Sequence, residues 1–222
     1  MNKKLALMSA ILLGSSPSLL NAQSQNSDEP ENYFAGHLGI HNLDDWDARV
    51  SLSDTIGFNG YLQIDSSWQG GILLGREYDN YRYEIELQEL NFNVTSVSVN
   101  GVSESKSRRD GHLRAVTFNA NRMFEIDNNF EAFAGLGIGW GETELPSKGF
   151  ENGCTCFPEA DESGLLWQAR LGLDYEYNEH TEFFIQYTRI LNMRGPSVKY
   201  TQPGIIYSEE DVSTISIGVR IR

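Results

Sequence analysis

Residues 165–177, with the sequence LLWQARLGLDYEY, decide the fold because apolar and polar residues alternate along them. One face carries apolar and aromatic residues: Leu165, Trp167, Ala169, Leu171, Leu173, Tyr175 and Tyr177. The other face is mostly polar and charged: Gln168, Arg170, Gly172, Asp174 and Glu176. A period of two predicts a β-strand whose two faces meet different environments.

Three short polar turns punctuate the chain at nearly equal intervals, and alternating segments lie on both sides of each. The turns are Asp79-Asn80, Asp127-Asn128-Asn129 and Asn178-Glu179-His180. Residues of this type accept the tight backbone geometry of hairpin loops. The chain is therefore predicted to form consecutive hairpins.

Aromatic residues indicate which environment the apolar face meets. Near the three turns they are Tyr78, Tyr81, Tyr83, Phe124, Phe130, Tyr175, Tyr177 and Phe183, and near the opposite strand ends they are Trp68, Trp140 and Trp167. A soluble sandwich also alternates, but it packs its apolar face on a second sheet. Two aromatic rims around an apolar belt are typical of a transmembrane β-barrel, so we expect the apolar face to contact lipid.

Eight strands follow from this pattern. Their expected ranges are 33–43, 68–78, 81–94, 112–124, 130–141, 165–177, 181–191 and 212–221. The prediction is an all-β fold over 32–222: an eight-stranded antiparallel up-and-down transmembrane barrel with three short periplasmic turns and four long extracellular loops. The loops are expected at 44–67, 95–111, 142–164 and 192–211.

The first residues predict export. Lys3 and Lys4 precede an apolar run over 5–13, and small residues follow at the end of the segment. This layout is typical of a secretory signal peptide, here 1–22 with cleavage between Ala22 and Gln23, followed by a flexible leader over 23–31. The net charge of −14 argues against nucleic acid as a partner.

Export permits a disulfide between Cys154 and Cys156. Because one residue separates them, the bridged ring would be strained. Free or intermolecular thiols remain the alternative.

The inward phase of the strands carries charge. Its charged residues are Arg82, Glu84, Glu86, Glu131, Arg170, Asp174, Glu176, Glu182 and Arg220. Buried charges persist when they are paired and hydrogen-bonded. We therefore expect a lumen network of carboxylates and guanidiniums, with Gly135, Gly137 and Gly139 leaving room for arginines; a polar pore is the alternative.

Three segments carry a family resemblance: 70–76 (GGILLGR), 132–139 (AFAGLGIG) and 216–220 (SIGVR). With the signal peptide and eight strands, the chain resembles the opacity-protein-like family of small outer-membrane β-barrel surface antigens, also described as porin-family barrels. The resemblance implies a surface protein of the outer membrane associated with adhesion, host interaction or envelope integrity. Such barrels usually end on an aromatic residue that the barrel-assembly machinery reads, whereas this chain ends Ile221-Arg222.

Candidate sites are few. His37 and His41 share the inward phase, as a metal pair or as hydrogen-bonded lumen side chains. None of the four histidines has the His-x-Ser spacing of lipid A deacylase barrels, so no enzyme activity, catalytic residue or cofactor is expected. Acidic loop clusters could hold calcium or stay solvated, without a defined ligand spacing.

Lys106, Arg108 and Arg109 form a basic patch in an otherwise acidic chain. It could contact the phosphates of lipopolysaccharide or an anionic host polymer, or simply be solvated. The sequence thus predicts a non-enzymatic surface barrel whose loops contact external or envelope partners. A narrow solute channel is the alternative.

Overall fold

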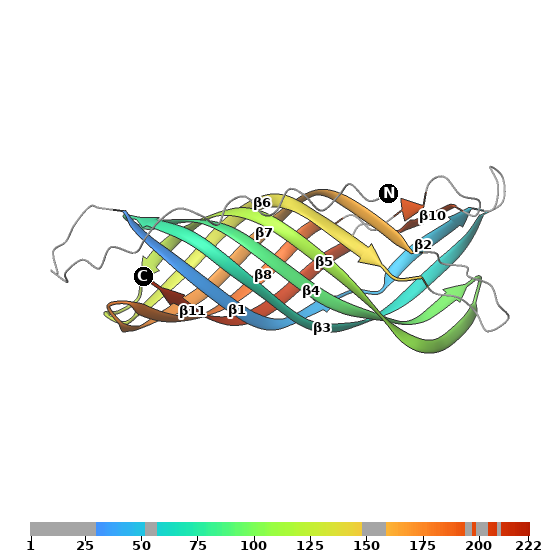
Figure 1. The fold of residues 1–222 in the computed structure, drawn as a ribbon, viewed down its shortest axis with the longest axis horizontal. Helices are drawn as coiled ribbons and strands as arrows, with labels where there is room; N and C mark the ends of the chain where they lie inside the picture. Colours follow the sequence, from blue (N-terminus) through green and yellow to red (C-terminus); the bar gives the residue numbers. More distant parts are fainter. Residues whose placement is uncertain (1–29, 52–56, 148–158, 194–196, 199–203, 208–209) are drawn as a thin grey trace, which may run out of the picture.

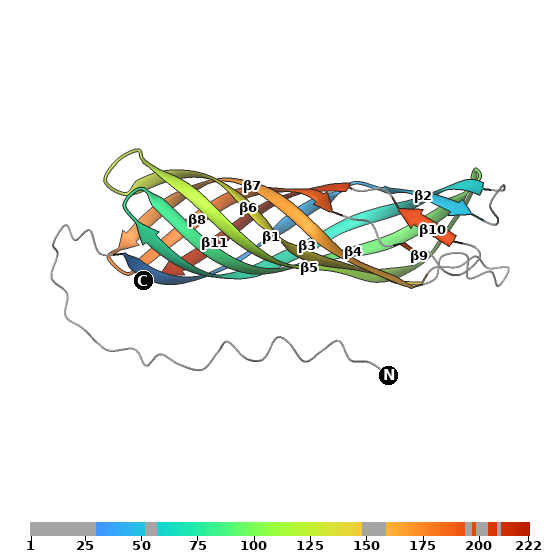
Figure 2. The same ribbon diagram turned by 90° about the horizontal axis from the view of Figure 1, so that it is seen from above.

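The computed structural model describes residues 30–51, 57–147, 159–193, 197–198, 204–207 and 210–222. At 50–51, 103–109, 192–193, 197–198, 204–207 and 210 it describes the backbone alone. The described chain forms one long cylinder of antiparallel strands, seen from the side in Figure 1 and after a quarter turn in Figure 2.

Eight strands close the barrel. They are β1 (Glu31–Leu43), β3 (Gly57–Tyr78), β4 (Tyr81–Val99), β5 (Val102–Glu125), β6 (Phe130–Leu145), β7 (Ala160–Asn178), β8 (Thr181–Met193) and β11 (Glu210–Ile221). Sequential neighbours pair from β3 to β8, β8 pairs with β11, and β1 pairs with both β11 and β3. The predicted closed, eight-stranded antiparallel barrel is confirmed.

The strands are longer than the sequence pattern predicted. The connection expected at 95–111 is wrong as a loop, because β4 and β5 continue through it to a two-residue turn, Asn100-Gly101. Both turn residues have positive φ, 52° and 83°, as the tight primed turns of hairpins require. The loop predicted at 44–67 is likewise mostly strand.

Three short strands extend the sheet at the end opposite the three polar turns. They are β2 (Trp46–Ser51), β9 (Ser197–Val198) and β10 (Gly204–Tyr207). β2 pairs with β3, β10 with β2, and β9 with β10. This extended end lies on the right of Figure 1, and the turn end, with the C-terminus, lies on the left.

The outer wall around the barrel's middle is apolar and exposed. Leu38, Ile40, Leu136, Leu171 and Ile217 point outward and are all exposed. In a search of the described residues, no helix has the length and apolar character needed to cross a membrane.

Candidate functional site

Partway along the long strands, the apolar residues change from the outer to the inner face of the barrel wall, and the polar residues change from the inner to the outer face. On β4 the outward residues run from Tyr83, Ile85 and Leu87 to Glu89, while the inward residues change from charged or polar side chains to Leu90 and Phe92. The alternation continues without a break at this point. Toward the turn end the wall is therefore apolar outside and polar inside, and toward the extended end it is polar outside and apolar inside.

The polar interior begins with a charged layer at the turn end. Arg82 donates to Asp174 at 2.8 Å, and Arg170 donates to Glu84 at 2.5 Å. Arg220 contacts Asp174 at 3.2 Å and also bonds Glu182. Each of these side chains is almost completely buried. The charges are thus paired with one another across the barrel interior.

Aromatic rings lie near two guanidiniums of the charged layer, those of Arg82 and Arg220. The carbon at the centre of the Arg220 guanidinium lies 4.9 Å from the ring centroid of Tyr33 and 5.1 Å from that of Phe184. Tyr33 also donates a 2.6 Å hydrogen bond to Glu84. The rings add cation–π attraction and exclude water from the ion pairs.

Two carboxylates expected in the lumen network lie at its mouth instead. Glu176 is exposed and Glu131 is half-buried, and both line a small polar hollow between the turns together with Arg222. Both residues stand within two positions of a turn, where the barrel opens to water. The other predicted members, Arg82, Glu84, Glu86, Arg170, Asp174, Glu182 and Arg220, are buried inside the barrel.

A second layer of amides and hydroxyls surrounds Glu86. Its carboxylate accepts hydrogen bonds from Asn119 and Gln168, each at 3.1 Å, and from Thr117 at 3.3 Å. His37 lies 2.9 Å from the same carboxylate. Sequence reasoning counted charges and missed these neutral partners, although they share the inward phase of the charged residues.

The lumen glycines make room for asparagine and aromatic side chains, not for arginines as predicted. At Gly135 a Cβ atom would lie 2.6 Å from the carbonyl oxygen of Ala120 and would collide with Asn121. Asn121 donates a 2.9 Å hydrogen bond to Glu84. The glycine thus lets an amide reach the charged layer.

Gly135→Ala is expected to lower the free energy of unfolding by about 1–3 kcal/mol, because the added methyl must displace Asn121 or the neighbouring backbone. Urea titration of the folded fraction in lipid vesicles would measure the change. The matched control is Gly36→Ala on the outer face, where a Cβ atom meets only a carbonyl oxygen at 3.9 Å. Equal losses for the two variants would contradict the account of Gly135.

An apolar core closes the barrel above the polar layers. Its members are Leu43, Trp46, Ala48, Leu62, Ile64, Leu90, Phe92, Val94, Val97, Leu113, Ala115, Leu145, Leu166, Ile190 and Val212, all buried. The rings of Trp46 and Phe92 lie 5.5 Å apart in a tilted arrangement. This apolar plug resembles the core of a soluble protein, and it shuts the lumen at the extended end.

His37, His41 and His112 are held in side-chain contacts, whereas His180 lies exposed in a turn. His41 lies 2.6 Å from the backbone carbonyl of Asn91, and His112 lies 2.7 Å from Glu144. In the part of the chain that the structure describes, no three His, Cys, Asp or Glu side chains are arranged to hold a metal.

Charged residues mark the outer wall where its apolar belt ends toward the extended end. Arg114 donates to Glu89 at 3.0 Å, and Arg189 donates to Asp211 at 2.9 Å. Farther out, Tyr61 donates a hydrogen bond to Asp45, which raises the pKa of the tyrosine hydroxyl. The residues beyond this boundary are suited to water.

Part of β5 projects beyond its neighbour β6. Pairing with β6 begins at His112 and Glu144, so within the described residues 102–105 and 109–111 pair with β4 alone, and the register shifts between these two segments. Lys106, Arg108 and Arg109 lie along this projecting strand and not in a loop, and their side chains are outside the described ones. Ala22, Gln23, Cys154 and Cys156 also lie outside the described residues.

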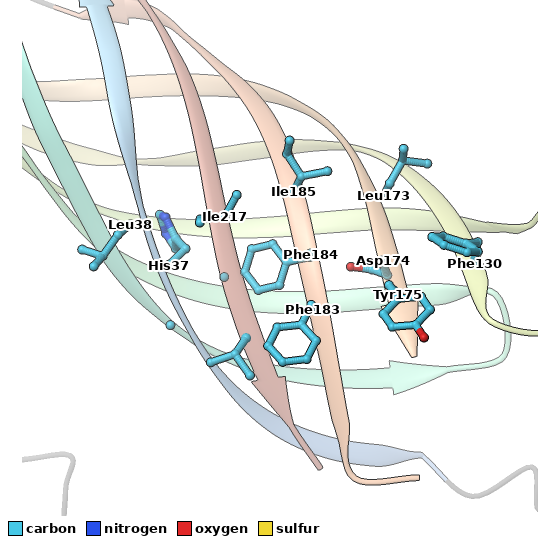
Figure 3. A pocket seen from close by; sticks show the side chains of 13 residues that line it. His37, Leu38, Phe130, Leu173, Asp174, Tyr175, Phe183, Phe184, Ile185 and Ile217 are labelled. Atoms are coloured by element: carbon cyan, nitrogen blue, oxygen red, sulfur yellow. The ribbon is translucent and has the colours of Figure 1, made fainter. Parts of the chain in front are cut away.

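A shallow apolar hollow lies on the lipid-facing wall near the turn end. Figure 3 shows its lining from β1, β11, β8, β7 and β6, including Leu38, Phe183 and Tyr175. Acyl chains would fill such a surface.

Comparisons with known proteins agree with this architecture. The sequence matches the family model for the outer membrane protein beta-barrel domain over residues 9–222. Among solved structures, Neisserial surface protein A is similar, with 11% identity, 87% of this chain and 98% of that chain covered, and a TM-score of 0.52. That likeness concerns the fold alone.

Two further barrels are less similar. The attachment invasion locus protein Ail of Yersinia pestis, solved with the heparin analogue sucrose octasulfate, shares 14% identity over 86% of this chain and 99% of that chain, with a TM-score of 0.45. The outer membrane protease OmpT of Escherichia coli shares 10% identity over 86% of this chain and 96% of that chain, also at 0.45. A search of curated proteins finds no match to the sequence.

Proposed function

The chain belongs to the outer membrane protein beta-barrel domain family, and from that premise we propose that it is a non-enzymatic, non-conducting surface protein whose extended end contacts partners outside the cell. It is an integral protein of the bacterial outer membrane. In the proposed orientation the three short turns face the periplasm and the sheet of β2, β3, β4, β5, β9 and β10 stands outside.

The doubly closed lumen is the observation that carries this proposal. A solute would have to pass the apolar plug and then the charged layer, whose arginines are all buried. Opening that layer would break buried ion pairs, which would cost several kcal/mol. This packing supports a non-conducting barrel over the narrow-channel alternative.

The extended end supplies the contact surface. The wall there is polar outside because its apolar residues form the plug, so the sheet can stand in water. Its projecting strand carries Lys106, Arg108 and Arg109, a basic group suited to phosphate or other anions. Lipopolysaccharide phosphates or anionic host polymers are the proposed partners, and the barrel-assembly machinery is the proposed partner during biogenesis.

The test combines conductance and contact. The purified protein in a planar bilayer should give no steady current, whereas a porin-like step current would favour the channel. For contact, Lys106, Arg108 and Arg109 would each be replaced by glutamine, which removes the basic group and keeps the strand. We expect cells with this triple variant to lose adhesion to animal-cell monolayers while the heat-dependent gel shift of the folded barrel persists; unchanged adhesion would oppose the proposal.

A further inference from the structure

Two arginines interrupt the apolar outer wall near the turn end. Arg76 on β3 and Arg122 on β5 both point outward and are exposed. The described wall between the three turns and the boundary at Glu89 and Arg114 has these two charged residues on its outward face. No ion pair joins either of them to a described acidic side chain.

The pairing register places the two arginines around a pair of tyrosines. Arg76 lies opposite Tyr83 on β4, and Arg122 lies opposite Tyr81 on the other side of the same strand. The two arginines are therefore two strands apart, about 10 Å across the sheet. Their long side chains can reach one object held over Tyr81 and Tyr83.

On its strand, each arginine is the outward-facing residue next to an aromatic residue of the rim, on the side away from the turns. Tyr78 follows Arg76 toward the turn end, and Phe124 follows Arg122. The Arg122 guanidinium lies 5.4 Å from the ring centroid of Phe124, so this side chain leans toward the membrane boundary. A charge at that depth requires a polar partner, because arginine on the lipid face costs up to about 2–4 kcal/mol at the bilayer centre and less near the boundary.

We propose that Arg76 and Arg122, with Tyr81 and Tyr83 between them, form a binding site for the head group of an anionic phospholipid in the membrane leaflet at the turn end. The guanidinium forks match phosphate oxygens, and the tyrosines lie at the depth where rings contact glycerol and head group. The protein is strongly acidic, with a net charge of −14, and these two arginines are cations that it presents to lipid on the wall near the turn end.

Lipid selectivity tests the proposal. The folded protein would be placed in phosphatidylcholine vesicles, and spin-labelled phosphatidylglycerol and phosphatidylcholine would be compared for the fraction immobilised at the barrel. An arginine near the membrane surface contributes roughly 1 kcal/mol toward an anionic lipid, about a five-fold preference. We expect the wild type to prefer phosphatidylglycerol and R76Q/R122Q to lose that preference.

Two controls make the result specific. Arg114→Gln removes an outward arginine at the opposite boundary, already paired with Glu89, and should keep the preference. R76K/R122K should keep part of it, because the charge remains while the planar fork is lost. Folding of each variant would be checked by its heat-dependent gel shift, and R76Q and R122Q alone serve if the double variant does not fold.

Equal immobilisation of the two lipids by the wild type would overturn the proposal. So would a preference that survives in R76Q/R122Q. Both outcomes are separate from the adhesion assay, since the lipid site lies at the other end of the barrel.

Discussion

Replacing Arg82 with methionine is expected to lower the free energy of unfolding by about 3–5 kcal/mol, which is the usual effect of removing one partner from a buried charge group. Arg82 is completely buried and contacts Asp174 at 2.8 Å, Glu77 at 3.4 Å and Glu182 at 3.7 Å. Without it these carboxylates face one another with fewer cations between them. Urea unfolding in lipid vesicles, followed by the gel shift, would measure the loss.

Arg114→Met is the matched control for Arg82→Met, because it removes an exposed arginine from the outer face of the neighbouring strand β5, at the boundary of the apolar belt. Exposed substitutions usually change stability by less than about 0.5 kcal/mol. Arg82→Lys should lie between the two, since lysine keeps the charge but cannot contact several carboxylates in one plane. Equal losses of stability in Arg82→Met and Arg114→Met would contradict a stabilising role for the charged layer.

Phe92→Ala should weaken the extended end by about 3–5 kcal/mol, the typical effect of removing a buried phenylalanine side chain. Phe92 is 1% exposed, packs on Trp46, and fills the space that Gly111 leaves open on the neighbouring strand. The loss should be local, because the charged layer lies below the plug. Hydrogen exchange should become faster in 57–66 and 90–113 while the turn end stays protected.

Phe118→Ala provides the comparison for Phe92→Ala. Phe118 lies on β5, and its side chain is on the lipid-facing wall at 50% exposure. Its removal should leave exchange at the extended end unchanged. Uniform acceleration along the whole barrel in Phe92→Ala would mean that the plug and the charged layer unfold as one unit, against the expectation.

The barrel itself could be predicted from the sequence because its alternation is strong where lipid meets the wall. Residues 165–177 alternate along their length. Gln168, Arg170 and Asp174 are buried in the interior as expected from their phase, whereas Glu176 is exposed. The polar turns after Tyr78, Ile126 and Tyr177 marked the three hairpin turns at one end of the barrel. These features depend on neighbouring residues, which a sequence shows directly.

The extended end could not be predicted in the same way. Beyond Leu87 the outward residues of β4 are polar, while Leu90, Phe92 and Val94 point inward. The predicted strand over 81–94 ends at Val94, whereas β4 continues to Val99. Whether such residues pack together depends on strands far apart in the sequence. The neutral partners of Glu86 were missed for a related reason. Asparagine and glutamine are mostly found on exposed surfaces, so their presence in the sequence does not mark a buried site.

The exchange of polarity along β4 also sets how deeply the molecule sits in its bilayer. Sinking by one outward residue would bring Glu89 among hydrocarbon chains, and rising by one would lift Leu87 into water. Both shifts are unfavourable, so the vertical position is fixed by the wall and is independent of how far the hairpins reach. Lengthening or trimming the projecting sheet should therefore alter the height of its tip above the cell and leave the anchoring depth unchanged.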